Sequence, residues 1–372
     1  MVETEVVLNI WLTTVFGYGS KYPVELIEKY GSAYNVLAMG KDELRFGKKT
    51  AAAQEAFKNP DLTYAQYIYN CCKEDDIEIL CYQDERYPHL LKEIPNPPAV
   101  LFYRGNIDLL NRRTFTVVGR RGMTVEGRRV LDDFVPVLQK AGFTIVAGFA
   151  IGAEAYMHRN FKNTVAVLPC GINLNYPTEN AGLKRKIVEN GGLVITEFMH
   201  DTAAYKGNFH LRNRILAGLS YGALVTQAGE NSGTSITATS AGEFSRPVYV
   251  VPGSIYDASY RGSNEMIHVG ATAVTSPWQI VAEYADIYED IRMDESRAPE
   301  PDAGVLDLGD SRYDDLDDNA VKILKCISGE RMHADEIAMR TGLNISVVNA
   351  TLSELEMEDL VVRMDNNLYM LK

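Results

Sequence analysis

Between residues 114 and 251 the chain alternates short apolar, β-branched runs with amphipathic segments. The apolar runs lie at 114–118, 144–147, 164–168, 193–196, 223–226 and 247–251. Amphipathic segments such as 125–140 and 182–190 separate them and have helical spacing. Strands that are apolar throughout are buried on both faces, as in a parallel sheet with helices on each side. The pattern predicts an α/β domain over 71–283, an extended Rossmann-like, doubly wound and mostly parallel sheet.

The first 70 residues have a different pattern. Apolar residues recur at helical spacing over 6–11 and 26–30, and glycine-rich turns separate the segments. We expect a small helical, SAM-like domain at 1–70. A helical pair with a glycine-rich hairpin can hold a nucleic-acid backbone, but this segment is acidic, so a packing or partner module fits equally well. Residues 77–82 and 100–103 are expected to be short strands that begin the sheet.

The C-terminal part divides into an irregular segment and an ordered one. Residues 284–318 lack hydrophobic periodicity and are rich in Asp and Glu, which predicts a flexible acidic linker. Residues 319–372 predict helices at 320–327, 334–341 and 346–356, followed by a hairpin of strands at 360–364 and 367–371. This order predicts a winged-helix domain. Its third helix contains no Lys or Arg, which favours protein interaction over major-groove reading of DNA.

Composition and charge narrow the function classes. The 372 residues suffice for two or three domains, and the net charge of −13 at first argues against nucleic acid. The charge is uneven, however: residues 101–280 hold 18 Lys and Arg against 13 Asp and Glu, whereas 281–320 hold 3 against 14. The central region is therefore mildly basic, and most of the acid is concentrated in one segment.

The cysteines and the N-terminus bear on localisation. The five cysteines form no CxxC pair and no Cys/His ligand spacing, which argues against a zinc site or a disulfide framework. The chain has no secretory signal pattern and no apolar run long enough to cross a bilayer. We therefore expect a cytoplasmic protein with reduced thiols and without a membrane partner.

Glycines, hydroxyls and arginines follow four of the predicted strands. In an open parallel sheet, ligands bind at the carboxyl ends of the strands, where helix N-termini favour anions. The four loops bring Gly119, Arg120, Arg121 and Thr124; Arg159; Ser232, Gly233 and Thr234; and Arg261 and Asn264. Each loop alone has a structural explanation, such as a tight turn or a helix cap. Their convergence predicts a site that holds phosphates.

The segment 209–220 adds the strongest single signal. Arg212, Asn213 and Arg214 follow Phe209 at the start of an apolar stretch. Guanidinium groups offer a planar fork of donors that suits phosphate oxygens, and the phenylalanine is a candidate surface for base stacking. The chain has no GxGxxG or Walker motif, so no cofactor is expected. His158 could be catalytic or a packed histidine, but no catalytic triad or metal set accompanies it.

Motif residues in a fixed order carry a family resemblance. They include Asp84, Tyr87-Pro88, Pro97-Pro98, Gly119, Arg121, Gly148, Gly152, Tyr176-Pro177, Phe209, Arg212 to Ser220, Ser232-Gly233, Val251 to Ser254 and Asn264. With this series the chain resembles the DNA processing protein A family, bacterial factors of natural transformation. The resemblance implies a non-enzymatic, homodimeric protein that binds single-stranded DNA. It also implies loading of a RecA-type strand-exchange recombinase onto incoming DNA coated with single-strand-binding protein.

The resemblance also implies a binding pocket with some departures from the family pattern. Its DNA contacts would come from Arg121, Arg212 and Arg214, shaped by Gly119, Asn213, Ser232 and Gly233. Four positions depart from the pattern: Arg120 stands where serine or threonine is usual, Ile151 where arginine is common, Glu154 for aspartate and Pro169 for glycine.

Two alternative functions remain open from the sequence. A nucleotide phosphoribohydrolase on the same fold would need a glutamate at the position of Thr237, and threonine cannot act as a carboxylate base. A protein-binding scaffold would explain the acidic tail but would leave the arginines of the sheet domain unexplained.

Overall fold

The computed structural model of the chain describes most of its residues in two units. The described residues are 2–43, 51–230, 232–288, 291, 316–327, 332–358, 360–363 and 368–371. The chain divides into compact units at 1–293 and 294–372. Most of the predicted linker 284–318 lies outside the described residues.

One sheet organises the larger unit. Its strands are β1 (Glu78–Cys81), β2 (Val100–Gly105), β3 (Arg113–Val118), β4 (Phe143–Gly148), β5 (Val165–Val167), β6 (Leu193–Thr196), β7 (Ala223–Val225), β8 (Val248–Val250) and β9 (Thr272–Ala273). Within the described residues these nine strands follow the order β1-β2-β6-β5-β4-β3-β7-β8-β9. Neighbours from β6 to β9 pair in parallel, whereas β2 pairs antiparallel with both β1 and β6. The predicted doubly wound, mostly parallel fold is confirmed.

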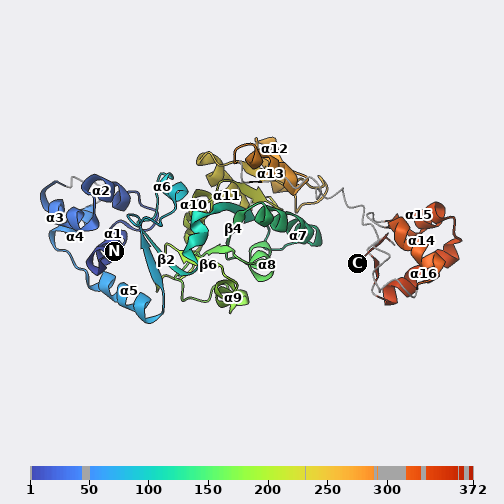
Figure 1. The fold of residues 1–372 in the computed structure, drawn as a ribbon, viewed down its shortest axis with the longest axis horizontal. Coiled ribbons are helices and arrows are strands. Elements are labelled where there is room, and N and C mark those ends of the chain that lie inside the picture. Colours follow the sequence, from blue (N-terminus) through green and yellow to red (C-terminus); the bar gives the residue numbers. More distant parts are fainter. Residues whose placement is uncertain are drawn as a thin grey trace. The chain divides into compact units, whose positions relative to one another are not determined.

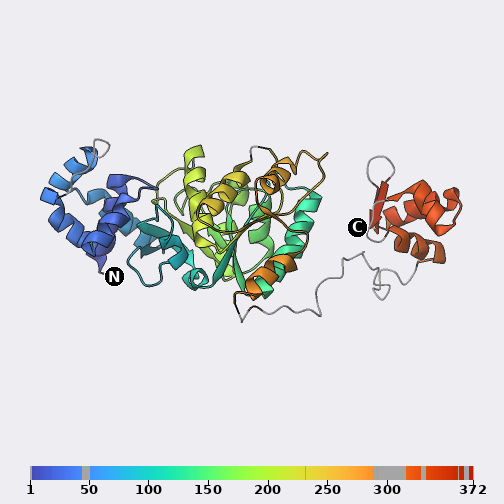
Figure 2. The same ribbon diagram turned by 90° about the horizontal axis from the view of Figure 1, so that it is seen from above.

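Helices cover both faces of this sheet (Figure 2). They are α6 (His89–Lys92), α7 (Val125–Lys140), α8 (Ala153–Asn160), α9 (Leu183–Glu189), α10 (Lys206–Leu219), α11 (Gly233–Glu243), α12 (Arg261–His268) and α13 (Pro277–Ala285). Adjacent residues of β4 point to opposite faces: Ile145 packs in a cluster with Leu131 of α7, and Val146 in a cluster with Ile215 of α10. Because β3 to β7 are buried on both faces, they appear as continuous apolar runs in the sequence, whereas the short edge strand β9 is exposed.

The N-terminal helices form one end of the larger unit (Figure 1). They are α1 (Glu3–Phe16), α2 (Tyr22–Tyr30), α3 (Ala33–Glu43), α4 (Ala51–Lys58) and α5 (Thr63–Glu74). Buried Ile10 and Trp11 of α1 belong to the same apolar cluster as Leu101 of β2. The core of these helices is therefore continuous with that of the sheet, and α5 runs past residue 70.

The smaller unit is a winged helix. Its helices are α14 (Asp318–Ile327), α15 (Ala334–Thr341) and α16 (Ile345–Met357), and its strands are β10 (Met332–His333), β11 (Val361–Arg363) and β12 (Leu368–Leu371). The strands pair antiparallel in the order β10-β12-β11. Ile323, Ile337 and Leu352, one from each helix, are fully buried in its core. The predicted three helices and hairpin are confirmed, and β10 is an additional strand.

Buried threonines of β3 anchor α10 to the sheet. The Thr116 hydroxyl donates to the Leu216 carbonyl oxygen at 2.8 Å and lies 2.7 Å from the Ser220 hydroxyl. The Thr114 hydroxyl donates to the Leu219 carbonyl oxygen. These bonds satisfy carbonyls that the last turn of a helix leaves without an intrahelical partner. They fix the C-terminal end of α10 beside β3, so its N-terminal end lies toward the carboxyl edge of the sheet.

His158 of α8 is a packed histidine rather than a catalytic one. It is fully buried, its Nε2 donates to the Gly148 carbonyl oxygen at 2.9 Å, and its Nδ1 accepts from the Thr164 hydroxyl at 2.8 Å. Burial lowers the pKa of His158 to about 4, and the nearby Arg212 guanidinium acts in the same direction. The imidazole is therefore neutral in the folded protein at neutral pH.

This pKa predicts a loss of stability in mild acid. The unfolded chain takes up a proton on His158 below about pH 6.5, whereas the folded chain does so only near pH 4. Stability is therefore lost as the pH falls through this window, by about 2 kcal/mol between pH 7 and pH 5. Urea unfolding of His158→Asn should lack this part of the pH dependence. His268→Asn, which changes an exposed histidine, should retain it.

Candidate nucleic-acid interface

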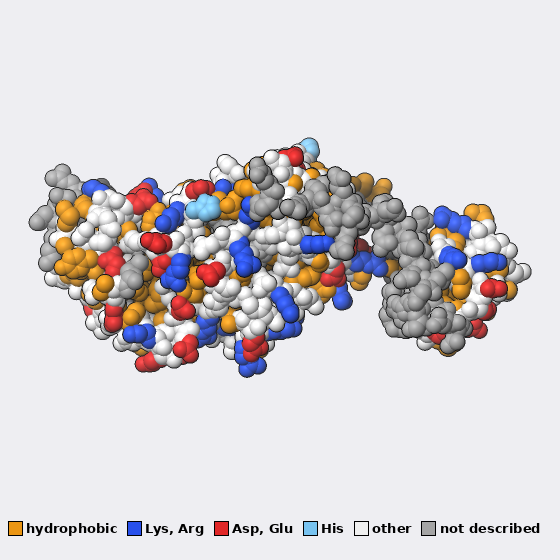
Figure 3. Space-filling model, in the orientation of Figure 1, with side chains coloured by type: hydrophobic (Ala, Val, Ile, Leu, Met, Phe, Trp, Pro, Cys, Tyr) orange, Lys and Arg blue, Asp and Glu red, His pale blue; other side chains and the backbone are white. Residues whose placement is uncertain are grey.

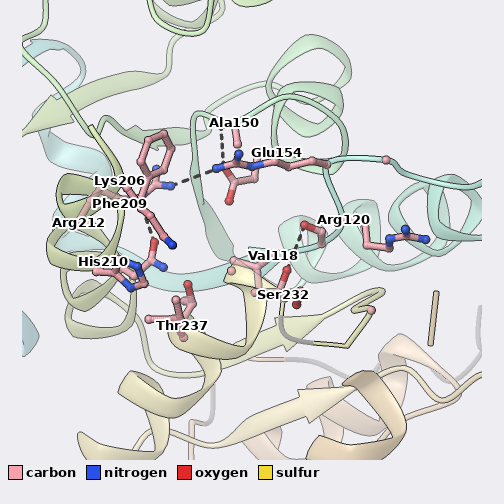
Figure 4. A pocket seen from close by; sticks show the side chains of 18 of the residues that line it. Val118, Arg120, Ala150, Glu154, Lys206, Phe209, His210, Arg212, Ser232 and Thr237 are labelled. Carbon is pink, nitrogen blue, oxygen red and sulfur yellow. Dashed lines mark hydrogen bonds and ion pairs between the residues drawn. The ribbon is translucent and has the colours of Figure 1, made fainter. Parts of the chain in front are cut away.

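A hollow of about 780 Å³ opens at the carboxyl edge of the sheet. Figure 4 shows side chains from α10 and α11 on neighbouring sides of it, with the loop after β3 opposite. The residues that line it include Gly119, Arg120, Arg121, Glu154, Tyr176, Tyr205, Lys206, Phe209, His210, Arg212, Asn213, Glu230, Ser232, Gly233, Thr234 and Thr237. The loops that meet at this edge are those that the sequence predicted would converge.

Arg212 forms the floor of the hollow and is only 2% exposed. Its guanidinium donates to the Val167 carbonyl oxygen at the end of β5 and to the Asn213 side-chain oxygen at 3.2 Å, and it lies 3.8 Å from the Glu154 carboxylate. Burial lowers the pKa of Arg212, an effect that Glu154 opposes. Gly148 makes room for this group, because a Cβ there would lie 2.4 Å from an Arg212 nitrogen.

The Phe209 ring lies against two guanidinium groups. The Arg121 guanidinium carbon is 5.1 Å from the ring centroid and that of Arg212 is 5.8 Å from it. The Tyr176 ring meets Phe209 edge-on, with centroids 5.9 Å apart. Such contacts orient Arg121, which is exposed, toward the hollow. The ring that the sequence proposed for base stacking therefore already has cationic neighbours.

The N-terminus of α11 contributes backbone donors to the hollow. Ser232 is the N-cap of this helix, and its hydroxyl makes no capping bond to a backbone amide; Gly233 and Thr234 begin the helix. Open space lies where a Gly233 side chain would be, and the Thr234 hydroxyl donates to the Gly119 carbonyl oxygen at 3.3 Å. Amides in the first turn of a helix have no intrahelical acceptor, and the helix dipole favours an anion there.

The charges around the hollow favour an anion. Four cationic side chains line it, Arg120, Arg121, Lys206 and Arg212, against two carboxylates. One of these, Glu154, already accepts from the Ala150 amide at 2.7 Å. Figure 3 shows Lys and Arg side chains interspersed with Asp and Glu on the face it displays.

The structure brings nine of the fourteen predicted DNA-binding residues together. Those lining the hollow are Gly119, Arg120, Arg121, Phe209, Arg212, Asn213, Ser232, Gly233 and Thr234. Those placed elsewhere are Thr124, Arg159, Arg214, Arg261 and Asn264.

Arg214 is the most consequential of the displaced residues. It is 6% exposed and its guanidinium lies 2.6 Å from the Glu197 carboxylate. The same carboxylate accepts from the Gly19 amide at 3.0 Å, so the pair ties the turn after α1 to the sheet. Residues two apart in a helix point about 200° apart, so Arg214 cannot face the hollow alongside Arg212. The structure assigns Arg214 to internal packing rather than to a DNA contact.

Three of the other four displaced residues support neighbouring backbone. Thr124 caps α7 by accepting from the Gly127 amide at 3.1 Å. Arg159 donates to the Glu179 carbonyl oxygen at 3.1 Å, and Asn264 exchanges hydrogen bonds with the Gly253 backbone at 3.0 and 3.3 Å.

Arg261, the fifth displaced residue, lies at the rim of the hollow. It is exposed, and its guanidinium is 3.9 Å from the carboxylate of Glu230, which lines the hollow. It therefore lies within reach of a ligand that extends beyond the hollow on this side.

Four aromatic or cationic side chains that line the hollow were not among the predicted DNA-binding residues: Tyr176, Tyr205, Lys206 and His210. Tyr176 and Tyr205 are 42% and 62% exposed, so their rings are more open to a base than that of Phe209. Lys206 is three residues before Phe209 and seven before Asn213, a spacing that puts all three on one face of a helix. This spacing could have predicted Lys206 as a residue of the hollow, and His210 directly follows Phe209 in the sequence.

Three further features of the described part of the chain concern metals, thiols and membranes. No group of three or more His, Cys, Asp or Glu residues there could hold a metal ion. The five cysteines carry free thiols. No helix among these residues is both long and apolar enough to cross a membrane.

Comparison with known proteins identifies the family. The profile described as DNA recombination-mediator protein A matches residues 78–285, which is more than half of the chain. The chain belongs to the DNA recombination-mediator protein A family. A second profile, described as the DprA winged helix domain, matches residues 310–367.

Curated relatives of this mediator-protein family cover much of the chain. Protein Smf of Synechocystis sp. is 35% identical over 309 residues, which are 76% of this chain and 77% of that protein. The DNA processing protein DprA of Streptococcus pneumoniae is 36% identical over 205 residues, 54% of this chain and 72% of that protein.

Solved structures of DNA processing protein A share the fold. The X-ray structure of the Streptococcus pneumoniae protein has a TM-score of 0.64 and 30% identity, and the match covers 74% of this chain and 97% of that one. The Helicobacter pylori protein has a TM-score of 0.52 and 26% identity, covering 57% and 97%. The latter structure is described as giving insight into a single-stranded DNA binding mode of that protein.

The buried Arg214–Glu197 pair should be essential for stability. Glu197→Gln leaves the Arg214 guanidinium buried without its anion, so the free energy of unfolding should fall by about 3–5 kcal/mol. The matched change Glu189→Gln breaks an exposed pair with Arg185 and should cost less than about 1 kcal/mol. Urea denaturation of both variants measures the difference, and equal costs would contradict the structural role of Arg214.

Proposed function

We propose that this protein binds single-stranded DNA in the hollow at the carboxyl edge of its sheet. The observation that carries the proposal is the convergence of Arg121, Lys206 and Arg212 with the N-terminus of α11 on one concave site. Cations and backbone amides together suit the phosphate oxygens of a polynucleotide. The Helicobacter pylori relative described with a single-stranded DNA binding mode supports the same ligand.

The aromatic rings favour a single strand over a duplex. Tyr176 and Tyr205 line the hollow with exposed rings, and the bases of a single strand are free to stack on such surfaces. A duplex keeps its bases stacked on one another and would offer only backbone to this concave site. Binding should therefore combine phosphate neutralisation with base stacking.

A binding role explains the site better than a catalytic one. Thr237 lines the hollow at the position where a phosphoribohydrolase would need its glutamate. Glu154, the buried carboxylate of the hollow, is engaged by the Ala150 amide and lies beside Arg212. Neither group is arranged as a general base. We therefore infer a non-enzymatic function, which release of a free base from a nucleoside monophosphate by the purified protein would contradict.

A more specific role is supported by membership of the mediator-protein family. We infer that the protein is a recombination mediator that loads a RecA-type strand-exchange recombinase onto incoming DNA coated with single-strand-binding protein. A cytoplasmic homodimer is the form consistent with this role. These assignments rest on the match to the mediator-protein family over residues 78–285.

The proposal is tested by removing exposed cations from the hollow. The double variant Arg121→Ala with Lys206→Ala should lower the affinity for an oligothymidylate at least about 10-fold at 0.15 M salt. If each side chain contacts one phosphate, the slope of log K against log salt should become shallower by about 1.4. Fluorescence anisotropy at several salt concentrations measures both effects. Arg212 is unsuitable for this test, because its removal would leave the Val167 carbonyl without a donor.

A matched control lies at the opposite end of β3 from Arg121. Arg112→Ala removes an exposed arginine just before β3, at the opposite edge of the sheet, and should change neither affinity nor salt slope. An unchanged affinity in the double variant, or an equal loss in Arg112→Ala, would show that the hollow does not bind the strand.

A further inference from the structure

The loop after β8 carries the most exposed large apolar side chain of the described residues. Tyr256 is 91% exposed and its neighbour Ile255 is 73% exposed. Most large apolar side chains in this unit are buried or lie against a neighbour. Two adjacent exposed side chains of this kind at one loop tip are therefore a feature that packing within the chain does not explain.

The loop that holds this tip is well ordered by its own hydrogen bonds. The Ser254 hydroxyl accepts from the Tyr256 amide at 3.2 Å, and the Ser254 carbonyl oxygen accepts from the Asp257 amide at 3.1 Å. The Asp257 carboxylate accepts from the Ser259 amide at 2.7 Å, and the buried Ser259 hydroxyl accepts from Gln227 at 2.8 Å. The tip is therefore held outward by a fixed turn rather than by a loose loop.

The loop lies next to the rim of the hollow. β8 neighbours β7 in the sheet, so the loops that follow both strands share the carboxyl edge. A Cβ added to Gly229, which lines the hollow, would lie 3.5 Å from the Ala258 carbonyl oxygen and 3.9 Å from Arg120 Nε. Residues 252–260 and Arg120 thus meet at Gly229, on the side of the hollow away from α10.

The charges at this rim suit a strand that leaves the hollow. Arg120 and the exposed Arg261 are the cations, and Asp257 and Glu230 the carboxylates. Hydrogen bonds from Ser259 lower the pKa of Asp257, and the charge of Arg120 adds to the effect, so this carboxyl is ionised. The Asp257 carboxylate accepts a hydrogen bond from the Ser259 amide and interacts electrostatically with Arg120. The Glu230 carboxylate lies 3.9 Å from the Arg261 guanidinium. Both arginines retain donors for phosphate, because each guanidinium has five.

We propose that Tyr256, flanked by Ile255, is a stacking platform for a base of the single strand just outside the hollow. This proposal rests on the proposed function and extends it by adding an aromatic contact outside the hollow, beyond Arg120. One tyrosine and one isoleucine are too small a surface for a stable protein interface, which buries roughly 800 Å² on each partner. The Tyr256 ring offers a surface on which a base can stack, and Arg120 and Arg261 offer donors for the neighbouring phosphates of the same DNA strand. The hollow then has exposed rings at both ends: Tyr205 beside α10 and Tyr256 beyond Arg120.

Strand length separates this contact from those inside the hollow. Affinities are measured for oligothymidylates of about 4 to about 16 nucleotides, with the wild type, Tyr256→Ala and Tyr256→Phe. Tyr256→Ala should bind the shortest strands normally and the longest about 5- to 150-fold more weakly, the equivalent of about 1–3 kcal/mol. Tyr256→Phe keeps the ring and should bind like the wild type. Tyr34→Ala, which removes a 60% exposed tyrosine of α3, is the matched control and should bind normally.

The readouts distinguish a failure of this proposal from a failure of the proposed function. Tyr256→Ala should leave the salt slope unchanged because no phosphate contact is lost, and long strands with abasic sites should reduce its disadvantage. If the wild type binds and Arg121→Ala with Lys206→Ala weakens it, but Tyr256→Ala has no effect at any length, the stacking platform is refuted alone. A change of oligomeric state in Tyr256→Ala, seen by light scattering with DNA affinity intact, would likewise overturn it.

Discussion

The buried guanidinium of Arg212 is the group on which the site depends. Arg212 is only 2% exposed, and a buried charge is stable only where fixed acceptors replace water. The acceptors come from three elements: the Val167 carbonyl of β5, the Asn213 side chain of α10 and the Glu154 carboxylate of α8. Gly148 leaves the space that the group occupies. The guanidinium therefore holds the end of β5 and the helices α8 and α10 in one arrangement, and the hollow is built above it.

The fixed Arg212 side chain gives the exposed cations of the hollow a rigid base from which to bind an anion. Arg121 lies against the Phe209 ring, which also has the buried Arg212 as a neighbour, so the ring is the contact that places the exposed arginine. The threonines of β3 fix the far end of α10 and thereby hold Lys206 and Phe209 at the carboxyl edge. Binding energy for an anion can then come from groups that are already in position, with little ordering required on association.

The two arginines of α10 show how far sequence reasoning could go. Their residue types indicated anion binding, and that interpretation fits Arg212 at the hollow. Arg214 lies on the other side of the helix, where a buried carboxylate and the turn after α1 enclose it. The turn at Gly19 comes from residues almost two hundred positions earlier in the chain, so no local pattern around 214 could reveal this partner. The tyrosines of the hollow were missed for a similar reason, because an aromatic residue in a loop has no periodicity to reveal its exposure.

The sequence by itself determined the fold class, the order of the elements and the edge of the sheet at which a ligand can bind. Apolar runs with helical segments between them specify a parallel sheet, and the carboxyl ends of its strands must meet at one edge. Tertiary structure alone decided which polar residues at that edge face the hollow and which form hydrogen bonds or ion pairs inside the protein. It also decided that the N-terminal helices share their core with the sheet. The reason is physical: periodicity records burial along one element, whereas pairing of charges depends on contacts between residues far apart in the chain.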